Sequence, residues 1–500
     1  MKLRTHLLNA SVARGSDLAC AAVLLALSAC GGGGDSSGTP PSDIGTLAYV
    51  VTQCSDEPKA LFSEHQALHI LHGDRDVTVM ETPGVGPVST GRVGLCREYA
   101  SERFGTLSAS REAFQRLAVS PDGAAVVFEV TGDFSTGPPL PLHLPPDQKG
   151  IFFVRADGGG LPRKLGPPSR VPEFFIRDSG FTVLNPRFGF SPDGRMITFT
   201  DKGPDAAGNE AAQVVTLDVY SGERRQVTHL PPGVPPPGAS RAPSVLDPRF
   251  IDNQTIGFLT DVNPDGSLPT GFFPFTVSLI DGTIKQAQLP VVLQGSSIDF
   301  TFIITGDKPA AIGLGVQGQP KNHLPGVGAQ ISEVFAVDGA NVLQLTNFER
   351  EDTGANGDNI FDVDRQTVYF TASADPDPLR SNPSENCQIF SIDRLGSNLR
   401  QLTQFSEGPQ ATSGCFFYGP PTVGCTSIIL NQDPRTRMLV FYSSCDPLGT
   451  NNHFGAQVFA MHPDGSGLRQ LTQTQGVVTQ PDGTVTRELP GPSAYGPYLP

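Results

Sequence analysis

Short apolar runs alternate along most of the chain with turns rich in Gly, Pro and Asp. One stretch shows the order: a Ser-Pro-Asp-Gly turn at 191–194, apolar runs at 196–199 and 213–218, the second ending in Asp, and Arg-Gln-Val-Thr at 225–228. Runs this short, bounded by turn residues, predict strands rather than helices. Because the same order recurs at a period of tens of residues, the pattern predicts an array of small β-sheets.

The repeat can be followed through the chain with varying fidelity. Its clearest copies start at Leu117, Phe188, Phe250, Ile360 and Ile428. A degenerate copy begins around 300–304 and is closed by 330–335 and 343–346. Ahead of these copies, the runs 47–51, 67–71 and 77–80 predict the second, third and fourth strands of a blade that lacks its first strand. We expect the chain end, 484–500, to supply that strand and so close a ring. The count is about seven four-stranded blades, with six or eight left open.

At these residues the chain resembles the WD40-like (PD40-type) repeats of TolB-type β-propellers, which also occur in prolyl oligopeptidase-type peptidases. The resemblance covers the chain from about Gly45 onward. It implies an all-β propeller whose strands are apolar throughout because blades pack face to face. The motif is specific for fold and says little about function.

Composition narrows the class of partner. With 500 residues the chain is too long for one ordinary core, and a repeat array accommodates that length. Its 56 Gly and 46 Pro suit many turns. The formal net charge of −15 argues against nucleic acid, since binding phosphate requires a basic face.

The N-terminus has the features of an export signal. Lys2, Arg4 and Arg14 precede an apolar run at 18–27 that is too short to span a bilayer. The run ends in Leu-Ser-Ala-Cys at 27–30, and a Gly-rich stretch follows. This resembles the lipobox of bacterial lipoproteins, which implies cleavage before Cys30 and lipidation of that residue; a plain secretory signal is the alternative.

These boundaries divide the chain into three parts. We expect a signal peptide over 1–29, a Gly/Ser-rich tether over 30–45 and the TolB-like propeller over 46–500. Because Gly31 rather than Asp follows the cysteine, the resemblance to lipoproteins implies sorting to the outer membrane, facing the periplasm or the cell surface. The propeller is thus expected in the cell envelope, held to the membrane by its lipid and monomeric.

An even set of cysteines in an exported protein predicts disulfides. The candidates outside the signal segment are Cys54, Cys96, Cys387, Cys415, Cys425 and Cys445. The strand assignment favours three disulfides, Cys54–Cys96, Cys387–Cys415 and Cys425–Cys445. Other connectivities, and buried free thiols, remain open.

Loop length differs between the two edges of the predicted blades. In a meandering blade the first-to-second and third-to-fourth loops share one edge, and here they are tight, as at 120–123 and 463–465. The second-to-third loops and the links between blades share the other edge, and these are long: 131–150, 166–184, 229–244, 347–357 and 405–424. Insertions concentrated at one edge predict a binding face; neutral variation of solvent loops is the alternative.

Aromatic residues are the candidates for contact on that face. They are Phe174, Phe175, Phe272, Phe273, Phe416, Phe417 and Tyr418. If exposed, they would form an apolar docking patch; alternatively they fold back over the blade ends, where large aromatics are usually buried. The chain has no Trp, which weighs against stacking on sugar rings.

Motifs for catalysis, nucleotides and metals are absent or incomplete. There is no Gly-x-Ser-x-Gly, His-Glu-x-x-His or Walker sequence. The Gly-x-Gly-x-x-Gly at 313–318 precedes prolines where a helix should start, so it is rejected as a dinucleotide site. Asp261, Asn263 and Asp265 resemble half of a calcium loop, but Phe272 stands where the bidentate Glu belongs. We therefore expect no cofactor and no metal.

Two functions remain. The first is a non-enzymatic binding or scaffold propeller whose long-loop face engages an envelope protein. The second is a propeller enzyme, a polysaccharide lyase or hydrolase with a site at the central channel. An enzyme requires convergent ionisable groups at the channel mouth, whereas a binder requires an apolar or charged patch on the loops.

Overall fold

The computed structural model describes residues 44–56, 63–82, 114–131, 144, 146–171, 188–232, 245–262, 273–286, 298–299, 310–315, 333–338, 341–348, 355–362, 364–375, 377, 379–380, 382, 386–405, 427–443, 445–451, 457–474, 477–479, 481 and 485–498. Residues 42–500 form one compact unit. In a few strands only the backbone is described. The described residues form strands and turns without any helix, as the apolar pattern predicts.

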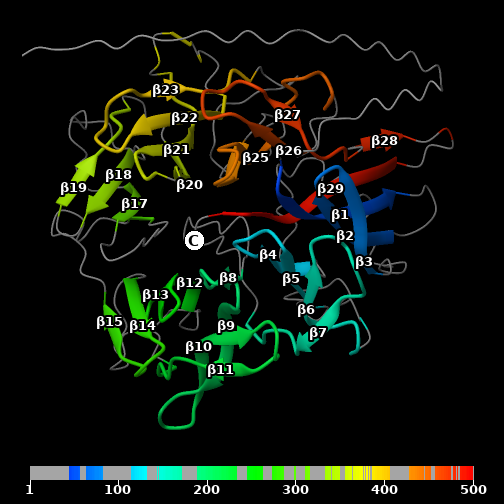
Figure 1. Cartoon of the computed structure of the whole chain (residues 1–500), viewed down its shortest axis with the longest axis vertical. Coiled ribbons are helices and arrows are strands. Elements are labelled where there is room, and N and C mark those ends of the chain that lie inside the picture. Colours follow the sequence, from blue (N-terminus) through cyan, green and yellow to red (C-terminus); the bar gives the residue numbers. More distant parts are fainter. Residues whose placement is uncertain are drawn as a thin grey trace, which may run out of the picture. The chain divides into compact units, whose positions relative to one another are not determined.

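These strands form seven antiparallel sheets that follow one another along the chain (Figure 1). Blade 1 contains β1 (Thr46–Asp56), β2 (Ser63–His72), β3 (Arg75–Thr82), β28 (Val477–Thr479) and β29 (Val485–Gly496). Blade 2 contains β4 (Phe114–Val119), β5 (Ala125–Val130), β6 (Gly150–Arg155) and β7 (Arg163–Gly166). Blade 3 contains β8 (Gly189–Phe190), β9 (Met196–Pro204), β10 (Glu210–Asp218) and β11 (Arg224–Gln226).

The remaining four sheets have the same meander of four strands. Blade 4 contains β12 (Val245–Asp252), β13 (Thr255–Thr260), β14 (Phe273–Ser278) and β15 (Ile284–Gln286). Blade 5 contains β16 (Ile298–Asp299), β17 (Ala310–Gly315), β18 (Glu333–Asp338) and β19 (Asn341–Gln344). Blade 6 contains β20 (Ala355–Phe361), β21 (Thr367–Ala372), β22 (Gln388–Asp393) and β23 (Arg400–Gln401). Blade 7 contains β24 (Ser427–Gln432), β25 (Leu439–Ser443), β26 (Gln457–Met461) and β27 (Arg469–Gln470).

Blade 1 joins the two ends of the described chain. β29 pairs antiparallel with β1, from Gly496 opposite Thr46 to Val485 opposite Asp56. This confirms that the C-terminal segment supplies the missing first strand. A fifth strand, β28, pairs with β29 on its other side and was not predicted.

The core lies between the sheets. Among the described side chains, six apolar clusters join blades 1 and 2, 2 and 3, 3 and 4, 5 and 6, 6 and 7, and 7 and 1. Val126 belongs to the cluster with blade 1, and its neighbour Val127 to the cluster with blade 3. Successive residues of a strand point to opposite faces, so both faces of a middle blade must be apolar. The seven sheets, the clusters between them and the closure by β29 make the fold a β-propeller.

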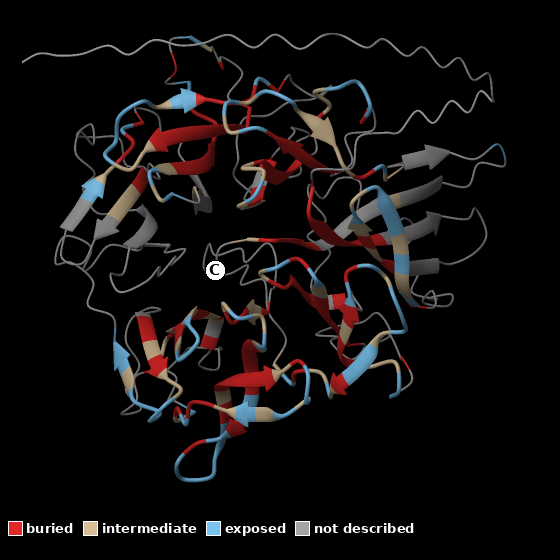
Figure 2. Cartoon of the chain, viewed as in Figure 1, coloured by how far each residue is buried: buried red, intermediate tan, exposed pale blue. Residues whose placement is uncertain are grey.

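The second and third strands carry most of this burial, and the fourth strands are more exposed (Figure 2). Four blades place two phenylalanines directly opposite each other on these middle strands. The pairs are Phe128 with Phe152, Phe258 with Phe275, Phe370 with Phe390, and Phe441 with Phe459, all stacked with ring centroids 5.4–6.0 Å apart. Such cross-strand aromatic pairs stabilise a sheet beyond simple burial.

Candidate functional site

Most connections between strands divide into the two predicted classes. At the tight-turn edge, β4 reaches β5 through 120–124 and β26 reaches β27 through 462–468. At the opposite, long-loop edge, β7 reaches β8 through 167–188 and β23 reaches β24 through 402–426. There are exceptions at both edges: the second-to-third connections 57–62 and 205–209 are short, and the first-to-second connection 300–309 between β16 and β17 is longer than the other tight turns.

The Ser-Pro-Asp-Gly phrase builds the tight turns. In blade 2, Asp122 accepts hydrogen bonds from the Ser120 hydroxyl (2.5 Å) and the Ala124 N–H (3.0 Å). In blade 3, Asp193 and Ser191 repeat the arrangement (2.6 Å). The polar residues of this phrase satisfy the backbone of the turn, so their role is structural.

A second repeated arrangement stands at the long-loop edge, where the third strand begins and the fourth ends. In blade 6, Gln388 Oε1 accepts from the Thr403 hydroxyl (2.8 Å) and the Phe405 N–H (2.9 Å), while its amide donates to the Phe405 carbonyl (3.0 Å). We call this arrangement the Gln–Thr clamp. Gln213 with Thr228 and Gln457 with Thr472 form it in blades 3 and 7. Because the clamped residue begins the link to the next blade, the clamp fixes the direction in which the link leaves each of these three blades.

Blade 5 has a carboxylate in place of the clamp glutamine. Glu333 accepts hydrogen bonds from the Thr346 hydroxyl and from the Phe348 N–H (2.7 Å). Its side chain is 1 % exposed. Burial raises the pKa of Glu333 to about 7, although both hydrogen bonds oppose the rise.

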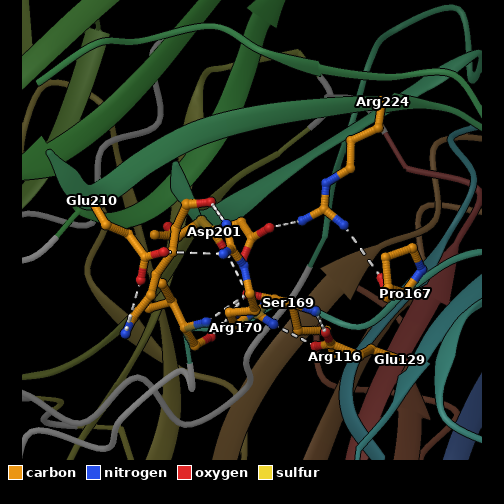
Figure 3. Close-up of polar contacts among 11 residues, drawn as sticks. Arg116, Glu129, Pro167, Ser169, Arg170, Asp201, Glu210 and Arg224 are labelled. Carbon is orange, nitrogen blue, oxygen red and sulfur yellow. Dashed lines mark hydrogen bonds and ion pairs between the residues drawn. The ribbon is translucent and has the colours of Figure 1, made fainter. Parts of the chain in front are cut away.

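A polar network holds the link that leaves blade 2 (Figure 3). Arg116 of β4 forms an ion pair with Glu129 of β5, and both side chains are buried. Arg116 also donates to the Val171 carbonyl (3.0 Å), and the Ser169 N–H donates to Glu129 (2.5 Å). The Ser169 hydroxyl donates to the Thr200 carbonyl of blade 3 (2.7 Å). The link is therefore fixed to two blades at once.

The next residue extends the network into blade 3 (Figure 3). Arg170 donates its N–H to Asp201 (2.6 Å) and its guanidinium to Glu210 (3.2 Å). Arg224 of β11 forms an ion pair with Asp201 and donates to the Pro167 carbonyl (3.3 Å). Burial lowers the pKa of Arg224 from its ordinary value, and the Asp201 charge opposes that shift.

In this network each guanidinium contacts a carboxylate, and two of the three also contact a link carbonyl. Paired charges of this kind hold a segment in place rather than move protons. Sequence reasoning did not find the network because its members come from separate repeats. The signal was a single charge inside otherwise apolar runs, Arg116 in 114–119 and Glu129 in 125–130.

The first strands, which line the centre of a propeller, are irregular. Pairing with the second strand shifts register in β4, β12, β20 and β24. In β12, Asp247 has a positive φ of 47° and forms an ion pair with Arg249 (2.8 Å). Bulges and strained residues occur frequently at functional sites. The two charges here are paired with each other.

Most of the predicted contact aromatics lie outside the described residues: Phe174, Phe175, Phe272, Phe416, Phe417 and Tyr418. Phe273 was expected in a loop. It is instead the first residue of β14, opposite Thr260, because the Phe-x-Phe alternation continues into the strand. Gly313 and Gly315 lie on β17, opposite Phe335 and Glu333 of β18. In a dinucleotide-binding fold these glycines would instead form a turn that leads into a helix.

The predicted chemical sites are described only in part. Asp261 lies just after β13, while Asn263 and Asp265 lie outside the described residues. Across the described ranges no group of His, Cys, Asp or Glu has the arrangement of a metal site. Cys30, the residue predicted to accept the lipid, is likewise outside them. No helix in the described part is long and apolar enough to cross a membrane.

Two of the six disulfide candidates have described side chains. Cys387 and Cys445 are fully buried and disulfide-bonded. Their expected partners, Cys415 and Cys425, lie outside the described residues, as does Cys96, and Cys54 is described only by its backbone at the end of β1. The pairing therefore stays a prediction.

No family model and no curated protein matches the sequence. Solved structures do. TolB from Acinetobacter baumannii is 12% identical with a TM-score of 0.36, over 89% of this chain and 82% of that one. A prolyl endopeptidase is 10% identical with a TM-score of 0.46, over 88% of this chain and 54% of that one. An oligogalacturonate lyase from Vibrio parahaemolyticus is 9% identical with a TM-score of 0.39, over 75% and 81%. These likenesses concern the fold, and the chain spans about half the length of the peptidase.

Proposed function

We propose that this protein is a non-enzymatic binding or scaffold propeller of the cell envelope, anchored by lipid at Cys30, whose long-loop edge engages a protein partner. The observation that carries the proposal is that the first residues of several long links are held to the blades by hydrogen bonds and ion pairs. The Gln–Thr clamps and the Arg116–Glu129 network fix their first residues to the blades. A link whose first residues are already fixed has less conformational entropy to lose on binding than one that is free from its start.

The chemistry of the described part favours a protein partner. The charges at the start of the link that leaves blade 2 are paired with each other. The net charge of −15 is unfavourable for binding nucleic acid. Long loops on a rigid scaffold are the usual location of binding residues.

Cross-linking of the full-length protein in its native envelope tests the proposal. One variant would have loop 172–187 shortened and another loop 406–426, both leaving the clamps and the Ser169 contacts intact. The matched control shortens the tight turn 156–162 at the opposite edge while keeping Leu161. We expect a cross-linked partner that is lost in one or both loop variants and retained in the control. A partner lost only in the control would contradict the proposal.

A second set of cells tests the anchor. Cys30→Ala should release the protein from membranes in cell fractionation, because the thiol that accepts the lipid is gone. Unchanged membrane retention would overturn the anchor and leave the binding face untouched.

The second candidate is a polysaccharide lyase or hydrolase at the channel. The positive φ of Asp247, on an irregular first strand, is the observation that favours it. The test is release of reducing or unsaturated sugar ends from a panel of acidic and neutral polysaccharides. Activity abolished by Asp247→Asn with the fold retained would establish the enzyme and displace the binding module.

A further inference from the structure

The polypeptide enters the propeller at the tight-turn edge. Thr46, the first residue of β1, donates its hydroxyl to the Gly123 carbonyl in the turn between β4 and β5 (2.6 Å). The Gly45 N–H donates to the Tyr495 hydroxyl (2.7 Å) near the other end of the chain. Any segment that precedes residue 44 is therefore attached at this edge, opposite the long links.

The same edge carries exposed apolar side chains at equivalent positions of the repeat. Tyr220, Ile280 and Leu395 each stand two residues after the end of a third strand, in the turns that follow β10, β14 and β22. They are 65%, 73% and 79% exposed. Leu161, in the longer turn after β6, is 93% exposed. One position of the turn thus presents an apolar group in three blades, although the hydrogen bonds of the turn do not require it.

We propose that the tight-turn edge faces the membrane and rests these side chains in the lipid interface. The inference deepens the proposed function, because it rests on the lipid anchor at Cys30. Even fully extended, the stretch 31–43 spans no more than about 45 Å. The propeller must therefore stay within that distance of the bilayer. The stretch 31–43 needs to extend least when the tight-turn edge, where it joins the propeller, faces the lipid.

The side chains suit such a surface. Leu and Ile gain free energy on leaving water, and Tyr combines an apolar ring with a hydroxyl that can remain hydrated. A covalent lipid and an apolar edge together provide two membrane signals, which hold a protein more firmly than one. In this orientation the long-loop edge is directed away from the bilayer and is open to a partner.

The absence of Trp from the sequence gives a direct test. Ile280→Trp and Leu395→Trp each place a sole indole at the tight-turn edge. Leu379→Trp is the matched control, since Leu379 is 90% exposed in the connection from β21 to β22 at the long-loop edge. Each full-length, lipidated variant is reconstituted in vesicles of phosphatidylethanolamine and phosphatidylglycerol, with and without bromine on the acyl chains. Indole quenching by the brominated lipid is then measured, and co-sedimentation with the vesicles is followed in the same samples.

We expect quenching at 280 and 395 several-fold stronger than at 379. Equal quenching at the three positions, stronger quenching at 379, or none at all in protein that co-sediments would overturn the orientation and leave the anchor standing. Failure of the lipidated protein to co-sediment, or equal co-sedimentation of a Cys30→Ala variant, would overturn the anchor and this inference with it.

Discussion

Glu333 accepts a hydrogen bond from the Thr346 hydroxyl at the position where three other blades place a glutamine opposite the equivalent threonine. A carboxylate therefore stands where the repeat otherwise uses a neutral amide. A buried glutamine donates to the link carbonyl at every pH, whereas a glutamate can donate only when it is protonated. The Glu333–Thr346 arrangement of blade 5 should consequently be the one whose hydrogen bonding depends on pH.

Stability should fall as the pH rises through the range in which Glu333 titrates. Its folded pKa of about 7 lies above the ordinary value of 4.5, so between these values the folded state binds more protons than the unfolded state. The contribution is fully present below pH 4.5 and is lost by about pH 7, with a magnitude of about 3 kcal/mol. Chemical denaturation at a series of pH values should show this slope in the natural protein and a flatter profile in Glu333→Gln. The reciprocal change Gln388→Glu should add a similar slope, and identical profiles for all three proteins would contradict the assignment.

Glycines in the turns between third and fourth strands should contribute to stability in two ways, by adopting a positive φ and by allowing a neighbouring blade to approach closely. Gly465 and Gly282 both have positive φ, 84° and 72°. A Cβ on Gly465 would overlap the Leu402 carbonyl oxygen of blade 6, whereas a Cβ on Gly282 would meet nothing within 4 Å. Gly282→Ala should lower the free energy of unfolding by about 1 kcal/mol, from backbone strain alone. Gly465→Ala should lower it by a further ~1–3 kcal/mol. Equal losses in urea denaturation would show that the close approach between blades is unimportant.

Closure of the propeller should depend on one hydroxyl. Tyr495 accepts from the Gly45 N–H and donates to Asp433 of blade 7, both at 2.7 Å, and burial raises its pKa above the ordinary value. Tyr495→Phe leaves a buried N–H and a buried carboxylate without this partner, so we expect a loss of about 1–3 kcal/mol. Hydrogen exchange should accelerate first in β29 and β1. The exposed Tyr220→Phe is the control and should change neither measurement; a Tyr495→Phe protein with unchanged exchange would argue against this role.

The buried ion pair should be costly to break and much less costly to replace. Arg116→Met leaves the Glu129 carboxylate buried without its counter-charge, and we expect a loss of about 3–5 kcal/mol. The double variant Arg116→Met/Glu129→Leu removes both charges and should be more stable than Arg116→Met alone. Limited proteolysis should still detect a loosened link, because Ser169 and Val171 lose their partners.

An exposed ion pair serves as the control for that experiment. Arg155 and Asp157 approach to 2.5 Å in a turn, with 68% and 46% of their side chains exposed. Solvent screens such a pair, so Arg155→Met should change stability little. A loss as large as that of Arg116→Met would mean that burial does not decide the difference.

The repeat pattern was sufficient to predict the blades, the closure by the C-terminal segment and the division into tight and long connections. These features follow from local turn chemistry and from strands apolar on both faces, which are visible in the sequence. The fifth strand of blade 1, β28, was not visible, since a short edge strand needs no apolar period. The network around Glu129 was also missed, because its partners lie in separate repeats and no spacing brings them together. Glu333 could have been found by aligning the repeats, where it replaces Gln213, Gln388 and Gln457.

The pairing of β29 with β1 has a consequence for the order in which the protein can mature. During synthesis the N-terminal strands emerge first, and one edge of β1 then remains unpaired until a strand encoded more than 400 residues later is made. An unpaired strand edge is a template for mispairing with other chains, and contacts this distant in sequence form slowly. The interval between emergence of the two ends is thus the period in which this protein is most exposed to aggregation, and a factor that shields nascent strands would act on blade 1.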